Sequence, residues 1–156
     1  MSFLKQIMDR GIARGARRHR RGTACVEFAV LSPLLLIFIL GIIDVGQFVN
    51  VGQSVSNASR EGARVAARQT TTNVSQVQSA VTNYMTDMHP NLPSSAVQVT
   101  VTGAGGPITG ADLAAVGTST PITVQVVVQF DPVRWMNGFT FLNGRTLTKT
   151  TVSRRE

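Results

Sequence analysis

The chain has 156 residues, enough for one small domain with an anchoring segment but too few for two independent cores. A net charge of +7 would suggest nucleic-acid binding if it were spread over the chain. Instead, residues 1–22 hold seven Lys/Arg and one acid, whereas residues 23–156 hold eight Lys/Arg and seven acids, so nucleic acid is not an expected partner. One cysteine and two distant histidines provide neither an intramolecular disulfide nor a metal site, and no cofactor is expected.

The first 22 residues form a basic leader. Apolar residues at helical spacing near its start predict a short helical turn. Its arginines cluster directly before Gly22, and a basic flank of this kind stays on the cytoplasmic side of a membrane. We therefore predict that residues 1–22 are cytoplasmic. The cluster consists of Arg17, Arg18, Arg20 and Arg21.

Residues 28–43 form an uncharged apolar run that would extend roughly 24 Å as a helix. Extension over residues 23–51 completes a membrane span, with Glu27 and Asp44 near its ends. A cleaved signal peptide would have a shorter apolar core followed by a small-x-small site. A buried core helix fits poorly behind an arginine-rich segment, and a transit peptide would explain only the leader. We therefore predict a single membrane-spanning helix that carries the C-terminal domain on its far side.

Beyond the apolar run, one helical face stays apolar while the other becomes polar, which predicts a single helix from about Thr23 to about Arg68. Arg60 and Arg64 are like charges one turn apart, and Glu61 can pair with Arg64. These arginines could face solvent, contact a partner, or clamp the last carbonyl groups of the helix within the domain. The sequence leaves these alternatives open.

A second helix is predicted after a polar break. Asn73 and Gln76 form a pair similar to a capping box, and His89-Pro90 would end the helix. The apolar residues between them recur at helical spacing, which favours a core-facing stripe over any cofactor site. The stripe consists of Val74, Val77, Val81, Tyr84, Met85 and Met88.

Three stretches after this helix have strand patterns. Alternation predicts strands at residues 97–101 and 122–130, joined by a glycine-rich connection that we expect to be a flexible loop. Residues 139–152 are also strand-like, with a hairpin turn at Asn143-Gly144 or at Asn137-Gly138. An aromatic cluster near the end is interpreted as core or membrane-interface residues rather than a docking patch. It consists of Phe130, Trp135, Phe139 and Phe141.

Together these elements predict an α+β, pilin-like domain over residues 52–156, after the leader and the span. The amphipathic half of the first helix would bury the apolar face of an antiparallel sheet of three or four strands. The sequence contains no catalytic set in a credible order, so neither enzymatic activity nor a small-molecule substrate is expected.

The junction at Gly22 has one unusual member, Glu27. A carboxylate at the edge of a bilayer costs on the order of 1–3 kcal/mol and usually has a partner. Cleavage after Gly22 would give Thr23 a new ammonium group, one helical turn from Glu27. The same pairing between neighbouring molecules would favour lateral assembly, because separation leaves both charges poorly compensated.

These residues are similar to the TadE-like family. The matching segments are residues 21–29, 33–36, 41–46, 58–64 and the ending 154–156. The resemblance implies a minor pseudopilin of the tight-adherence (Flp) pilus or a related secretion apparatus in the bacterial inner membrane. It also implies cleavage by a prepilin peptidase between Gly22 and Thr23, with Glu27 serving processing or assembly. The implied partners are the membrane, that peptidase, other pilin or pseudopilin subunits and the pilus assembly machinery. The alternative is an unprocessed, membrane-anchored periplasmic binding or interaction module.

Overall fold

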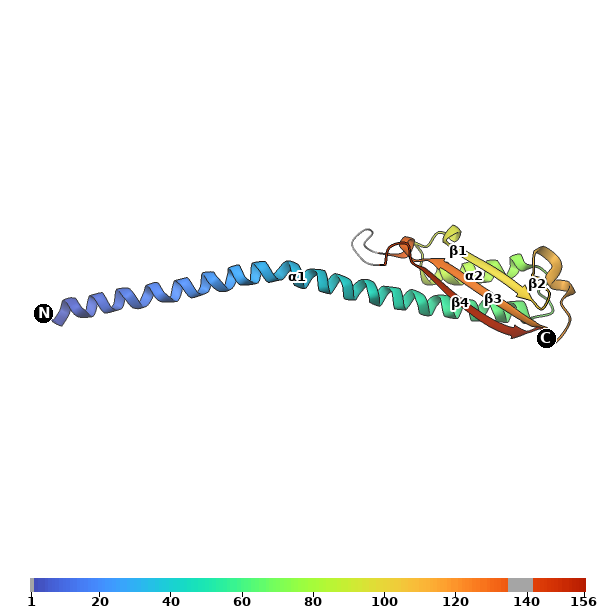
Figure 1. Ribbon diagram of the computed structural model, residues 1–156, viewed down its shortest axis with the longest axis horizontal. Coiled ribbons are helices and arrows are strands. Elements are labelled where there is room, and N and C mark those ends of the chain that lie inside the picture. Colours follow the sequence, from blue (N-terminus) through green and yellow to red (C-terminus); the bar gives the residue numbers. More distant parts are fainter. Residues whose placement is uncertain (1, 135–141) are drawn as a thin grey trace. The chain divides into compact units, whose positions relative to one another are not determined.

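The computed structural model of the protein describes residues 2–134 and 142–156, with side chains from residue 22 onward. The chain divides into two compact units, Met1–Ile43 and Asp44–Glu156. Helix α1 (Ser2–Ala67) supplies the described part of the first unit and the beginning of the second (Figure 1). The fold is α+β, as predicted, with a second helix and a four-stranded antiparallel sheet.

Helix α1 begins earlier than the sequence predicts. We expected a helix from about Thr23 with only a short turn in the leader, but α1 is continuous from Ser2. Arginine, the commonest residue of the leader, has a favourable helix propensity, and the leader contains no proline to interrupt the helix. At its other end α1 stops at Ala67, beside the predicted Arg68.

Helix α2 (Val74–Met88) has the predicted ends. The side chain of Asn73 accepts a hydrogen bond from the Ser75 amide at 2.9 Å. The side chain of Gln76 accepts from the amide of Thr72 at 3.1 Å, one residue before the cap, so the capping box is present in a shifted form. The predicted stripe is buried at Val74, Val77, Val81 and Met85, whereas Tyr84 is half-buried and Met88 is exposed.

The sheet has the strand order β2-β1-β3-β4, and every neighbouring pair is antiparallel. Strands β1 (Val97–Gly103), β3 (Pro121–Gln129) and β4 (Thr146–Arg154) correspond to the three predicted stretches. Strand β2 (Gly106–Pro107) lies in the connection that we expected to be a flexible loop, and it pairs with the end of β1. A strand of two residues is too short to show an alternating pattern, so the sequence could not predict it.

The beginning of the predicted third stretch, residues 139–141, lies outside the described residues, and so does the alternative turn Asn137-Gly138. Gly144 has φ +68°, in the left-handed region that glycine adopts readily, so a turn does occur at Asn143-Gly144. Strand β4 begins after this turn, at Thr146.

The core of the second unit lies where α1, α2 and the sheet meet. Alternate residues of β3 are fully buried, namely Ile122, Val124, Val126 and Val128. At Gly62 of α1, an added Cβ would lie 2.6 Å from Val81 Cγ2 of α2 and 3.2 Å from Val124 Cγ1 of β3. Only glycine lets the three elements approach this closely. The prediction that α1 covers the apolar face of the sheet is confirmed.

Strand β4 runs beside α1 (Figure 1), and polar contacts join the two elements. The hydroxyl oxygens of Ser59 and Thr151 lie 2.8 Å apart, and the hydroxyl of Ser153 donates to the carbonyl oxygen of Ala63 at 2.9 Å. Only Leu147 of β4 is a buried apolar residue. Strand β4 is therefore attached to α1 mainly by hydrogen bonds, which compensate for its polar sequence.

Candidate functional site

The predicted processing junction lies on α1 within the first unit. Gly22, Thr23 and Glu27 are all exposed, and Thr23 and Glu27 are separated by one helical turn. Apart from the adjacent backbone of α1 and the two neighbouring residues, no described atom comes within 4 Å of the position that a Cβ of Gly22 would take. The junction is thus open at its surface. The side chains of the basic cluster, Arg17, Arg18, Arg20 and Arg21, lie outside the described set.

The helix after this junction has the properties of a membrane span. Among the described residues, one candidate segment is long and apolar enough to cross a bilayer, Gly22–Ala67, with a mean hydropathy of 2.6 over its most apolar window. No part of that window is buried. Its valine, leucine, isoleucine and phenylalanine side chains from Val26 to Ile43 are mostly more than half exposed. Such a surface fits a single-pass membrane protein, because water would be a poor solvent for it.

The two arginines near the end of α1, Arg60 and Arg64, are exposed rather than clamped within the second unit, and Glu61 between them is half-buried. Arg64 Nε donates to Glu61 Oε2 at 2.8 Å, so the predicted i,i+3 pair is present. This hydrogen bond holds the pKa of Glu61 below its usual value and raises the pKa of Arg64. Arg60 is exposed as well and makes no ion pair with any described residue.

Asp44, the first residue of the second unit, is buried against an arginine ninety positions away. Arg134 Nε and Nη2 each lie 3.2 Å from one carboxylate oxygen of Asp44. The side chain of Arg134 is fully buried and that of Asp44 is 7% exposed. This paired geometry satisfies both oxygens, and a buried charge of either sign would be costly without the other.

Aromatic and polar groups hold Arg134 in place. Its guanidinium lies 5.7 Å from the ring centroid of Phe130, and that ring packs edge-on against Phe48 of α1 with centroids 5.1 Å apart. Arg134 also donates to the side chain of Asn143. Phe130 is a core residue, as predicted. The other members of the predicted aromatic cluster, Trp135, Phe139 and Phe141, lie outside the described residues.

The comparison with known families bears on the segment that contains most of these groups. Residues 22–64 match the TadE-like protein family. The match begins at the predicted cleavage glycine and ends at Arg64, so it includes Glu27 and Asp44. Comparison with curated proteins and with solved structures found no match.

The TadE-like match confirms the resemblance seen in the sequence. It suggests a role in assembly related to the Flp/Tad pilus, and the family is a structural, non-enzymatic kind of protein. Arg134, the partner of Asp44, lies beyond the TadE-like segment.

A second buried arginine, also beyond the TadE-like segment, closes the end of α1. Arg155 Nη1 donates to the carbonyl oxygen of Ala66 at 2.8 Å, and its Nη2 donates to that of Thr71 at 2.9 Å. The amide of Glu156 donates to the carbonyl oxygen of Ala67 at 2.9 Å. The last two carbonyl groups of α1, which have no partner within a helix, are therefore bound by the two residues that follow β4.

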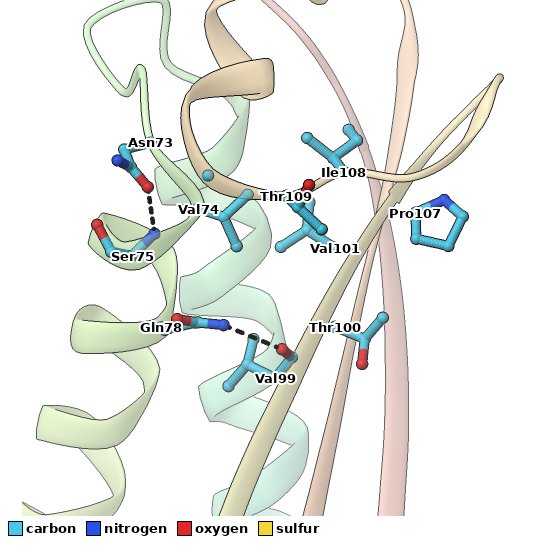
Figure 2. A pocket seen from close by; sticks show the side chains of 11 residues that line it. Asn73, Val74, Ser75, Gln78, Val99, Thr100, Val101, Pro107, Ile108 and Thr109 are labelled. Atoms are coloured by element: carbon cyan, nitrogen blue, oxygen red, sulfur yellow. Dashed lines mark hydrogen bonds between the residues drawn. The ribbon is translucent and has the colours of Figure 1, made fainter.

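A cavity of about 370 Å³ lies between the start of α2 and strand β1 (Figure 2). Figure 2 shows Gln78 of α2 reaching towards the carbonyl oxygen of Val99, which its Nε2 approaches at 3.5 Å. The eleven residues that line the cavity include no titratable side chain. Its lining therefore offers no side chain suited to general acid or base catalysis.

Sequence reasoning missed Arg134 and Arg155. A signal existed for the first, because an acidic residue at the end of an apolar run requires a partner. It did not identify which of the eight Lys/Arg of residues 23–156 is that partner. For Arg155 no such signal existed, because residues 154–156 were named only for their resemblance to the family and were given no structural role.

Proposed function

We propose that this protein is a structural minor pseudopilin that takes part in assembly of a tight-adherence (Flp-type) pilus or a related secretion apparatus. The observation that carries the proposal is the TadE-like match over residues 22–64, which starts at Gly22 and includes Glu27 on an exposed apolar helix. In this proposal a prepilin peptidase cleaves the bond between Gly22 and Thr23. Other pilin or pseudopilin subunits and the pilus assembly machinery are the partners.

Cleavage would change the charge balance at the start of the span. The leader with its arginine cluster would leave, and Thr23 would gain an ammonium group one helical turn from Glu27. Both charges would then lie at the edge of a low-dielectric region, where each is stabilised by the other or by its counterpart on a neighbouring subunit. Removal of the leader would in this way promote lateral assembly.

The proposed topology has the leader in the cytoplasm, one span through the bacterial inner membrane and the second unit in the periplasm. The division at residue 51 between span and exported domain stays a prediction. The packing supports a boundary nearer Asp44, because Val51 is fully buried and Gln47 donates to the carbonyl oxygen of Val133 at 2.8 Å. A span of residues 23–43 would extend about 32 Å, close to the hydrocarbon thickness of a bilayer.

The proposal is tested by co-expression of the full chain with a prepilin peptidase, followed by intact-mass measurement. We expect a product that starts at Thr23, and we expect Gly22→Ala to abolish its formation. Gly41→Ala is the matched control, because Gly41 lies further along the same helix and, like Gly22, has no described atom within 4 Å of an added Cβ. A wild-type chain that still starts at Met1 would favour the unprocessed, membrane-anchored periplasmic module.

A further inference from the structure

One stripe of α1 in the second unit points away from the core along its whole length. Its residues follow one another at alternating spacings of four and three, so they share one face of the helix. All of them are exposed. We call this set the outer seam; it consists of Gly46, Asn50, Gln53, Asn57, Arg60 and Arg64.

Gly46 has no role inside the second unit. It lies in the interior of α1, where glycine is less favourable than alanine, and it has no positive φ that would require glycine. Apart from the adjacent backbone of α1 and the two neighbouring residues, no atom of the described part of the chain comes within 4 Å of the position of an added Cβ. Gly62 on the opposite side contrasts with it, because there Val81 and Val124 leave no space for a side chain. A missing side chain at Gly46 instead allows another helix to approach closely.

The arginines of the outer seam are also unnecessary for the stability of α1. The carbonyl groups at the end of the helix that arginines could bind are occupied by Arg155 and by the amide of Glu156. Arg60 and Arg64 repel each other across one turn, and Glu61 compensates only for Arg64. With Arg68, exposed just beyond the helix, they form a basic row with a net charge of two.

The chemistry of the seam indicates which kind of helix it would accept. Asn50, Gln53 and Asn57 offer amide donors and acceptors to a neighbouring helix without adding charge. Two copies of this chain in one membrane, with the same orientation, would bring equal residues to equal levels. Their basic rows would then face each other and repel. A helix with carboxylates at that level would instead be attracted.

We propose that the outer seam docks a parallel helix of a different membrane-anchored subunit, one that carries acidic residues at the level of Arg60 to Arg68. The proposal deepens the proposed function, on which it rests, by naming the chemistry of one partner. The amides provide close, polar helix contact, and the basic row selects the acidic subunit over a second copy of this chain.

Disulfide cross-linking of full chains in membrane vesicles tests the proposal. All chains carry Cys25→Ser and a new cysteine in the outer seam, Asn57→Cys. The probe for an acidic helix is a second version of the chain with Arg60→Glu, Arg64→Glu and Arg68→Glu, distinguished by its mass. We expect the mixed pair to cross-link at least about fivefold more than the basic chain alone, and the difference to disappear at high salt, which screens exposed charges.

Two controls keep the result interpretable. Ser79→Cys places the cysteine on the exposed side of α2 instead and should give no charge-dependent product. If the acidic version fails to fold, a version with Arg60→Gln, Arg64→Gln and Arg68→Gln should still cross-link with itself more than the basic chain does, because the repulsion is gone. Intact mass on the same samples reports cleavage after Gly22, so a failure of the proposed function is seen separately.

Two outcomes would overturn the proposal. Equal cross-linking of the basic chain with itself and with the acidic version would make a second copy the occupant of the seam. Absence of any product through Asn57→Cys, in every combination of folded chains, would show that this face does not dock a helix.

Discussion

The two parts of α1 show opposite ways of stabilising one helix. Between Gly22 and Ile43 its apolar side chains are exposed, and none of the most apolar window is buried. From Asp44 to Ala67, one face packs into the core and is bonded to residues about ninety positions away. The first part needs a nonpolar solvent, whereas the second carries its own partners. Substitutions in the first part should therefore change insertion, and those in the second should change folding.

The largest effect is expected at the buried ion pair. Arg134→Met leaves the carboxylate of Asp44 buried without its bidentate partner, and loss of one member of such a pair costs about 3–5 kcal/mol. Hydrogen exchange of β3 amides in the detergent-solubilised full chain measures the loss. Asp44→Asn combined with Arg134→Met should recover part of it, since the uncompensated charge is gone. Arg64→Ala, at an exposed pair, is the control and should leave exchange unchanged.

A substitution in the first part of α1 should have a comparable free-energy cost, but this cost should appear in membrane insertion rather than in folding. Leu36→Arg places a cation near the centre of the proposed span, which costs about 2.5–3.5 kcal/mol for insertion. The membrane-inserted fraction should fall, while exchange of the β3 amides in detergent should not change. Faster exchange in this variant would show that the two parts of α1 are not independent.

Alanine substitutions at two glycines of α1 should change the free energy of unfolding in opposite directions. Gly62→Ala forces a Cβ against Val81 and Val124 and should destabilise the second unit by about 1–3 kcal/mol. Gly46→Ala meets no described atom and should stabilise the helix by roughly 0.5–1 kcal/mol. Urea midpoints of both variants in micelles measure the difference. Equal signs would contradict the packing described for Gly62.

The smallest effect is a pH dependence at His89, whose ring Nε2 lies 3.1 Å from the Ser54 hydroxyl of α1. Burial lowers the pKa of His89, so the unfolded chain binds a proton more readily than the folded one. Stability should be complete above the ordinary histidine pKa of about 6.5 and should fall as the pH drops from there towards the lower folded pKa. Thermal unfolding between pH 8 and 5 tests this, and His89→Gln should flatten that part of the profile.

The sequence was most informative where structure depends on local pattern. The end of α1, the stripe of α2 and the alternation in β3 all follow from helix or strand periodicity. Strand β2 was missed because two residues carry no period, and Arg134 and Arg155 were missed because their contacts join distant parts of the chain. The need for glycine at Gly62 could not be predicted either, because it depends on how three elements meet.

The same contrast applies to the candidate site. Gly22, Thr23 and Glu27 could be named from the sequence as candidates because the proposed cleavage and charge pairing involve residues close together in the chain. The partner of Asp44 could not, and neither could the choice between solvent and clamp for Arg60 and Arg64. That choice follows only once Arg155 is seen to hold the end of α1.

The most direct test of a processed pilus subunit is the N-terminal residue of the chain isolated from membranes of cells that make a prepilin peptidase. We predict a single mature form that begins at Thr23 and lacks the arginine-rich leader. A membrane-inserted, folded chain that begins at Met1 in those same cells would contradict it.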